Sequence, residues 1–183
     1  IRDRVWPLYE GKDKNEALYT LFEVSEKVCR LLCPFVPFLA EEVYQDVLKE
    51  FDIEKVESIH LKDWPEVNEN LIDKGLEERM EIAREIFEVC CNLRQKLKLK
   101  LRWPLEKMIV ESEDENVRKA CEELEEVLKF MCNVKQLKFG KLEENLEVGE
   151  FERGKVGIPR ELSENLKPEA LFREIVRKVQ DLR

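Results

Sequence analysis

Apolar residues recur at helical spacing through most of the first hundred positions. From Lys14 they follow one another at steps of three and four, which places them on one stripe of an α-helix that must end before Pro34. A second stripe follows Pro37, which suits the first turn of a helix. The Pro-Phe-Val-Pro corner between them is short, so we expect two helices packed antiparallel or nearly so. The residues expected to be buried are Ala17, Leu21, Val24, Val28 and Leu31 in the first helix, and Ala40, Val43, Val47 and Phe51 in the second.

A charged connector, VESIHLKDWPEV (56–67), leads to a third and longer helical pattern. Trp64 and Pro65 end this connector, which is typical of an extended piece lying along a bundle. The long helix is expected from about Asn70 to residue 97. The residues expected to face inward along it are Leu76, Met80, Ala83, Phe87, Cys90 and Leu97.

The hydrophobic period changes near residue 97. Four apolar residues now alternate with four basic ones, a period of two that a strand presents as one face and a helix does not. We therefore predict a strand that ends at Pro104, with KMIVE (107–111) as the returning strand of a hairpin. The alternating residues are Leu97, Leu99, Leu101 and Trp103 on one side, and Lys96, Lys98, Lys100 and Arg102 on the other.

The remaining pattern mixes helices with short strands. A helix is expected over 115–133, short strands over 134–139, 146–151 and 155–159, and an amphipathic helix from 167 onward. The last helix is expected to bury Leu171, Ile175, Val179 and Leu182. The fold is therefore predicted to be mainly α: an antiparallel helical bundle over 1–97, then a small α+β domain over 98–183 that ends in the C-terminal helix.

Charge is distributed unevenly along the chain. The whole sequence has a formal net charge of −9, yet residues 94–107 hold six Lys or Arg and one Glu. We call residues 94–107 the basic ribbon. Neighbouring like charges on one strand face repel one another, and RNA phosphate would relieve that repulsion. The alternative is that these lysines protect an edge strand from aggregation and are neutralised by nearby acidic helices. The candidate RNA contacts in the ribbon are Arg94, Lys96, Lys98, Lys100 and Arg102.

Two further features leave alternatives open. Trp103 is suited to stacking on a base, but it shares its strand parity with three leucines, which favours a place in the core. Arg2 and Arg4 beside Trp6 are candidates for RNA contacts or for a solvated end with an aromatic anchor.

The composition excludes several other kinds of site. With His60 as the single histidine, most nucleophile–histidine arrangements are excluded. The six cysteines show no CxxC spacing, so buried thiols are favoured over zinc, although Cys29 and Cys33 could supply half of a metal site. No phosphate-binding glycine motif occurs. No apolar run is long enough to cross a membrane, and no secretory signal is visible, so the cytoplasm is the expected compartment.

Four segments, in this order, resemble the anticodon-binding region of the large class I aminoacyl-tRNA synthetases. They are IRDRVW (1–6), LFEVSEKVCRLLCPFVPFLAEEVYQ (21–45), SIHLKDWPEV (58–67) and LRQKLKLKLRWPLEKMIV (93–110). The Pro-Phe-x-Pro-Phe corner with its following Ala-Glu-Glu is shared with valyl and leucyl enzymes. The segment at 93–110 favours the isoleucyl-tRNA synthetases of the archaeal and eukaryotic type, and REIVRKVQDLR (173–183) is similar to a later helix of those enzymes.

This resemblance implies a domain that grips the anticodon stem and loop of a tRNA. The partners implied are an isoleucine-accepting tRNA and the catalytic body of a longer ligase. Arg2, Arg4 and Trp6 match an Arg-x-Arg-x-Trp element, and both ends of the chain look cut from something longer. The catalytic signatures of His-Ile-Gly-His and Lys-Met-Ser-Lys-Ser type are absent, so ATP and Mg²⁺ would be cofactors of the parent enzyme and not of this segment. The alternatives are the same domain of a valyl or leucyl enzyme, and an acidic helical adaptor that binds a protein partner.

Overall fold

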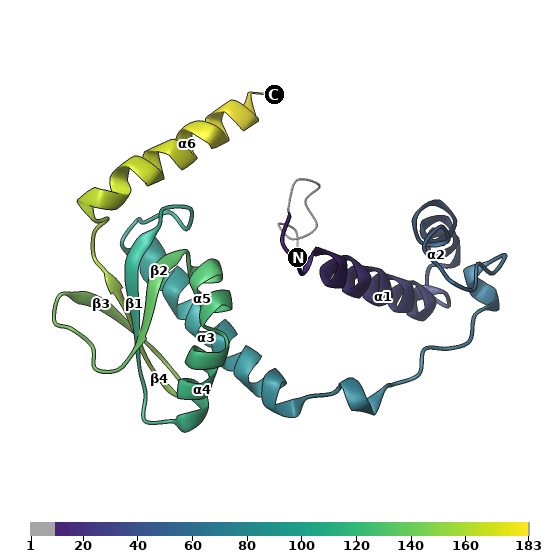
Figure 1. Cartoon of the computed structure of the whole chain (residues 1–183), viewed down its shortest axis with the longest axis horizontal. Coiled ribbons are helices and arrows are strands. Elements are labelled where there is room, and N and C mark those ends of the chain that lie inside the picture. Colours follow the sequence, from purple (N-terminus) through teal and green to yellow (C-terminus); the bar gives the residue numbers. More distant parts are fainter. Residues whose placement is uncertain (1–9, 183) are drawn as a thin grey trace. The chain divides into compact units, whose positions relative to one another are not determined.

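The computed structural model describes residues 10–182, whose helices and strands are shown in Figure 1. These residues divide into two compact units, of which the first ends at Leu71 and the second begins at Ile72. Arg2, Arg4 and Trp6 lie outside the described residues.

The N-terminal unit is built from short helices around a small core. Its elements are α1 (Lys14–Leu32), α2 (Pro37–Val43), the π-helical turn η1 (Tyr44–Leu48) and the 3₁₀ turns η2 (Ile59–Leu61) and η3 (Glu69–Leu71). The first two helices are confirmed, and Pro37 stands at the start of α2 as expected. The connector after η1 is not simply extended, because η2 forms within it. The buried apolar core of this unit contains Cys29, Tyr44, Leu48 and Ile59.

The prediction of which face of α1 is buried is wrong for the described structure. Val24, Val28 and Leu31 are exposed, and the face that packs into the unit instead carries Phe22, Cys29 and Cys33. The spacing is helical in both cases, but the buried face is rotated around the helix because residues of η1 and η2 cover it. Of the second predicted stripe, Ala40 is buried whereas Val47 and Phe51 are exposed.

The C-terminal unit combines a four-stranded mixed sheet with four helices among its described residues. Its elements are α3 (Lys74–Lys96), β1 (Leu105–Glu111), α4 (Glu115–Glu123), α5 (Glu125–Cys132), β2 (Val134–Phe139), β3 (Leu146–Phe151), β4 (Gly154–Pro159), the 3₁₀ turn η4 (Glu164–Leu166) and α6 (Lys167–Asp181). The strand order is β2-β1-β4-β3. β1 pairs in parallel with β2 through the α4–α5 crossover, and β4 is antiparallel to both β1 and β3. The strands predicted at 134–139, 146–151 and 155–159 are confirmed.

The domain boundary expected at residue 97 differs from the division between the units. α3 packs against β3, β4, α4 and α5, so the helix belongs with the sheet and not with α1 and α2. Its buried residues include Ile82, Ile86, Cys90 and Leu93, which join the strands in one core. The predicted bundle of residues 1–97 is therefore not confirmed. The predicted helix at 115–133 is also divided, because α4 ends before Leu124 and α5 begins after it.

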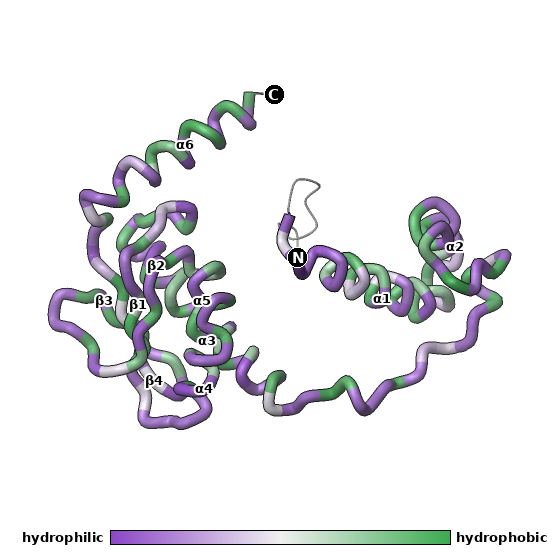
Figure 2. Tube along the Cα trace, viewed as in Figure 1, coloured by the Kyte–Doolittle hydropathy of each residue, from purple (hydrophilic) through white to green (hydrophobic). Residues whose placement is uncertain are grey.

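The final helix has the predicted form without the predicted burial. Figure 2 shows apolar segments recurring along α6. Within the described part of α6, however, Ala170 is the one buried residue, and Leu171, Ile175, Val179 and Leu182 are exposed. The first half of the helix is instead attached to the unit by polar side chains that are described below. No helix in residues 10–182 has the length and apolar character of a membrane span.

The cysteines behave as free thiols. Cys33 Sγ donates a hydrogen bond to the backbone oxygen of Cys29 at 3.3 Å. Burial is the main cause that raises the pKa of both thiols. This arrangement agrees with the buried-thiol interpretation of the pair.

Candidate nucleic-acid interface

The centre of the basic ribbon is a compact turn and not the predicted strand. α3 ends at Lys96, residues 97–104 wind through successive turns, and the sheet begins only at Leu105. Lys98 adopts the left-handed conformation, with φ of 57°, and Leu99 N donates to Arg94 O at 2.8 Å. The segment in which leucine and lysine alternate therefore forms a turn and not a strand. The predicted hairpin is also wrong, because β1 lies between β2 and β4.

Arg94 holds this turn in place. Its side chain is only 2% exposed, and it lies on the same face of α3 as Cys90. One terminal nitrogen donates to the carbonyl oxygens of Lys100 at 3.1 Å and Trp103 at 2.9 Å. The other donates to those of Cys132 at 2.6 Å and Asn133 at 3.1 Å. We therefore correct the assignment of Arg94: its guanidinium is occupied inside the protein and is not presented to a phosphate.

Several other ribbon cations are paired with carboxylates from distant parts of the sequence. Lys96 pairs with Glu147 of β3, and Lys107 pairs with Glu143. These pairs agree with the alternative in part: acidic residues neutralise the ribbon, but they come from β3 and the loop before it and not from helices.

Glu174 of α6 accepts hydrogen bonds or ion pairs from three side chains of the ribbon. It accepts from Lys100 at 3.0 Å, from Arg102 at 3.2 Å and from the indole nitrogen of Trp103 at 3.1 Å. The hydrogen bond from Lys100 is the largest cause that holds the pKa of Glu174 below its ordinary value. Arg173 adds a bond from its guanidinium to Arg102 O at 3.2 Å. Together these contacts fasten the first half of α6 to the ribbon.

Trp103 contributes to packing within the C-terminal unit more than to its exposed surface. It is half-buried and packs against the core of the C-terminal unit, which agrees with the interpretation of a core residue. Lys100 lies over its ring with the ammonium 5.3 Å from the ring centre. A base would have to displace Lys100 to stack on that face of the ring.

Lys98 is the ribbon cation that stays available. Its side chain is exposed, and within residues 10–182 it has neither an ion pair nor a side-chain hydrogen bond. The left-handed backbone at Lys98 sets it at the apex of the turn. Lys96 and Lys100 are paired but remain half-exposed or more, and Arg102 is partly exposed. The surface of this turn therefore presents Lys98 without an ion pair among the described residues, and Lys96, Lys100 and Arg102 with one.

A buried ionic cluster in the N-terminal unit was missed by sequence reasoning. Lys62 is 6% exposed and its ammonium lies 2.7 Å from Asp52, 3.0 Å from Glu26 and 3.5 Å from Glu54. The hydroxyl of Tyr44 donates to Asp52 at 2.8 Å. Burial raises the pKa of Tyr44 to about 12. The only signal in the sequence was Glu26 on the same helical face as Phe22 and Cys29.

Comparison with known proteins identifies the class to which this arrangement belongs. A family described as the anticodon-binding domain of tRNA ligase matches residues 1–109. The chain therefore belongs to this family of tRNA-ligase domains.

The relatives that this chain resembles are isoleucine–tRNA ligases. An isoleucine–tRNA ligase of Pyrococcus abyssi is 45% identical over 148 residues, which cover 81% of this chain and 14% of the relative. One from Archaeoglobus fulgidus is 34% identical over 241 residues, covering 100% of this chain and 24% of the relative. One from Methanosarcina mazei is 42% identical over 137 residues, covering 75% of this chain and 13% of the relative. The chain is thus similar to part of these isoleucine–tRNA ligases, and it spans between about an eighth and a quarter of their length.

Proposed function

We propose that this chain binds the anticodon stem and loop of an isoleucine-accepting tRNA as part of a longer ligase. In that ligase it would orient the tRNA so that the acceptor end reaches a catalytic body elsewhere in the polypeptide, in the cytoplasm. The match of residues 1–109 to the anticodon-binding family carries this proposal. The sequence contains neither of the catalytic signatures of the class, so ATP and Mg²⁺ are assigned to the rest of the ligase.

Phosphate contacts from the ribbon would position the RNA without reading its sequence. Lys98 can meet a phosphate without giving up any existing ion pair, because it has none among the described residues. Lys96, Lys100 and Arg102 would first have to exchange a carboxylate for a phosphate. Arg2 and Arg4 remain proposed contacts on the matched first segment. Because the chain is acidic overall, we expect weak binding in isolation, and attachment to the rest of the ligase would raise the effective concentration.

Replacing Lys98 with glutamine is expected to weaken tRNA binding and to reduce the slope of log affinity against log salt by about one unit, the effect of one lost phosphate contact. Fluorescence anisotropy with labelled tRNA across a salt series measures both quantities. Lys119→Gln, at an exposed site on α4, is the matched control for the change in net charge. Equal slopes for Lys98→Gln, Lys119→Gln and the unaltered chain would rule out Lys98 as a contact.

Replacing Glu174 with glutamine is expected to strengthen tRNA binding and steepen the salt dependence. The change removes the charge that neutralises Lys100 and Arg102, so both cations become available to phosphate. Glu161→Gln, an exposed acidic position with the same change in net charge, is the control. Weaker or unchanged binding by Glu174→Gln, relative to this control, would show that the two cations do not face RNA.

The exposed apolar side of α6 favours a second candidate function. Leu171, Phe172 and Ile175 are each more than half exposed, a surface that a protein partner could cover. If the chain were only a protein adaptor, a filter-binding assay with bulk tRNA would show no salt-dependent retention. Competition among tRNAs that accept isoleucine, valine and leucine then separates the isoleucyl proposal from its valyl and leucyl alternatives.

A further inference from the structure

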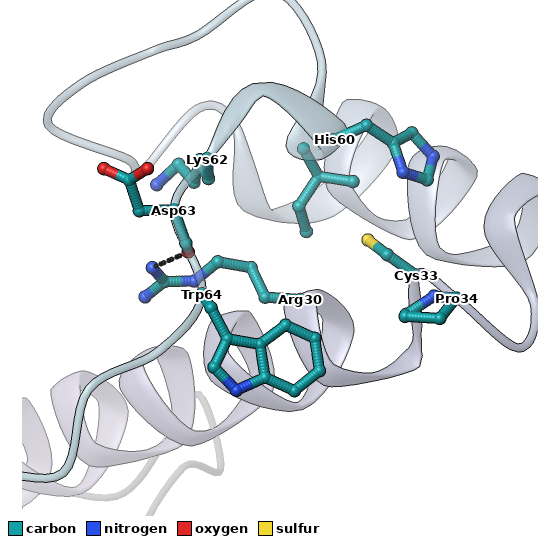
Figure 3. A pocket seen from close by; sticks show the side chains of 8 residues that line it. Arg30, Cys33, Pro34, His60, Lys62, Asp63 and Trp64 are labelled. Atoms are coloured by element: carbon teal, nitrogen blue, oxygen red, sulfur yellow. Dashed lines mark hydrogen bonds between the residues drawn. The ribbon is translucent and has the colours of Figure 1, made fainter.

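The N-terminal unit contains a half-open pocket of about 160 Å³ that none of the assignments above uses. Figure 3 shows its lining side chains, which come from the end of α1 and from the segment around η2. Ile59, which is almost fully buried, lines it together with Cys33 and Pro34. Arg30 and Trp64 line it as well. The pocket therefore combines apolar side chains with charged and polar ones and with two flat groups.

Trp64 is a largely exposed aromatic side chain of this pocket. It is 60% exposed although it is a large aromatic residue, and within the described part of the chain its indole N–H has no acceptor. Figure 3 shows the indole ring next to the side chain of Arg30. An exposed indole with a flat face is well suited to stacking on another planar ring.

Arg30 has a fixed position at the same wall. One terminal nitrogen donates to the backbone oxygen of Asp63 at 3.0 Å, and the other donates to Glu26 at 2.7 Å. Its Nε is buried and has no hydrogen-bond partner. The bond to Asp63 also ties the segment carrying Trp64 to α1. The backbone next to Trp64 is therefore held beside Arg30 before any ligand arrives, which lowers the ordering cost of binding.

The charges around the pocket indicate a neutral ligand. The ammonium of Lys62 is surrounded by three carboxylates, and the guanidinium of Arg30 is paired with Glu26. Neither cation is free to neutralise a phosphate. A site lined by apolar side chains, by the flat groups of Arg30 and Trp64 and by the His60 ring suits an uncharged heterocycle.

We infer that this pocket holds one unpaired nucleobase of a single-stranded RNA loop, stacked on Trp64. Bases in loops are unstacked, and aromatic and arginine planes are the side chains on which proteins receive them. The phosphate contacts at the ribbon carry no sequence information, whereas a base pocket can. This inference rests on the proposed function and adds to it a site that receives a base.

The test uses an anticodon stem–loop RNA with the isoleucine anticodon and a set of loops that each lack one base. Trp64→Ala is expected to weaken binding of the complete loop about tenfold, whereas Trp64→Phe, which keeps an aromatic face, retains most of the affinity. One abasic position should weaken binding by the unaltered chain and have no further effect on Trp64→Ala. Phe130→Ala, at an exposed aromatic residue of α5, is the control and should bind normally.

The outcomes separate this inference from the proposed function. No binding of the stem–loop by the unaltered chain would reject the proposed function. Equal affinity of Trp64→Ala and the unaltered chain, or no coupling between Trp64 and any abasic position, would reject the pocket as a nucleobase site and leave the proposed function standing. An apolar peptide side chain is then the remaining kind of occupant. Circular dichroism checks that Trp64→Ala is folded. If it is not, quenching of 2-aminopurine placed in the loop of the RNA reports stacking on Trp64 in the unaltered chain, and its absence at every loop position rejects the pocket.

Discussion

Replacing Arg94 with methionine is expected to lower the free energy of unfolding of the C-terminal unit by about 4 kcal/mol, because it leaves buried carbonyl groups without donors. Arg94 donates to four backbone oxygens that connect the turn at 97–104 with the end of α5. Methionine fills a similar volume but donates no hydrogen bond. Urea unfolding measures the loss. The experiment uses a background in which Trp6 and Trp64 are replaced, so that the fluorescence of Trp103 reports this unit alone.

Two matched variants check the cause of this loss. Arg94→Lys keeps the positive charge but has fewer donors in a different geometry, so it should recover only part of the stability. Arg84→Met, at an exposed position of the same helix, should change the free energy of unfolding by no more than about 0.5 kcal/mol. An unfolding midpoint of Arg94→Met equal to that of Arg84→Met would contradict the structural role of Arg94.

Replacing Lys62 with methionine is expected to lower the free energy of unfolding of the N-terminal unit by about 3 kcal/mol, because it leaves the buried carboxylate of Asp52 without its cation and leaves Glu26 with Arg30 alone. Glu26 and Asp52 are each 5% exposed, and both contact the Lys62 ammonium. Unfolding of this unit is followed by the fluorescence of Trp64 in a background in which Trp6 and Trp103 are replaced. Lys27→Met breaks an exposed pair with Glu23 and should cost less than about 1 kcal/mol.

The same cluster predicts how stability depends on pH. Burial acts to raise the pKa of Asp52, but hydrogen bonds from Lys62 and Tyr44 outweigh it and hold that pKa below its ordinary value. Burial acts to lower the pKa of Lys62, but its bonds to Asp52 and Glu26 outweigh it and raise that pKa. A lowered carboxyl pKa contributes stability that is lost as the pH falls below about 4, and a raised lysine pKa contributes stability that is lost as the pH rises above about 10.

Removing Lys62 should reverse the acid dependence. Without the ammonium, burial favours the protonated form of Asp52, so mild acidification is expected to stabilise Lys62→Met relative to neutral pH. Unfolding curves of both chains between pH 4 and pH 7, roughly the range over which carboxyls with ordinary and raised pKa values titrate, measure the difference. Parallel pH profiles for the two proteins would show that the cluster contributes little to the stability of this unit.

The local sequence pattern was sufficient to predict most of the helices and strands and to indicate the family. The spacing in α1 and α3, the proline at Pro37 and the short strands from residue 134 onward are properties of neighbouring residues, and each of these elements is present. The segments that resemble tRNA ligases are likewise contiguous stretches of sequence, and they agree with the family match over residues 1–109. The sequence alone therefore determined which class of domain this is.

Only the tertiary structure decided what the basic ribbon does. Its alternating pattern was compatible with a strand, but Arg94 gathers carbonyl groups from residues up to 39 positions away and stabilises a turn instead. Glu147 and Glu174, which pair with Lys96 and Lys100, are 51 and 74 positions distant. The pocket likewise depends on Arg30 meeting the segment of Trp64 across more than 30 residues. Periodicity describes which neighbouring side chains share a face of a helix or strand. Burial and pairing depend instead on which distant groups the fold brings within hydrogen-bond distance. The partners of these charges could therefore be known only from the folded chain.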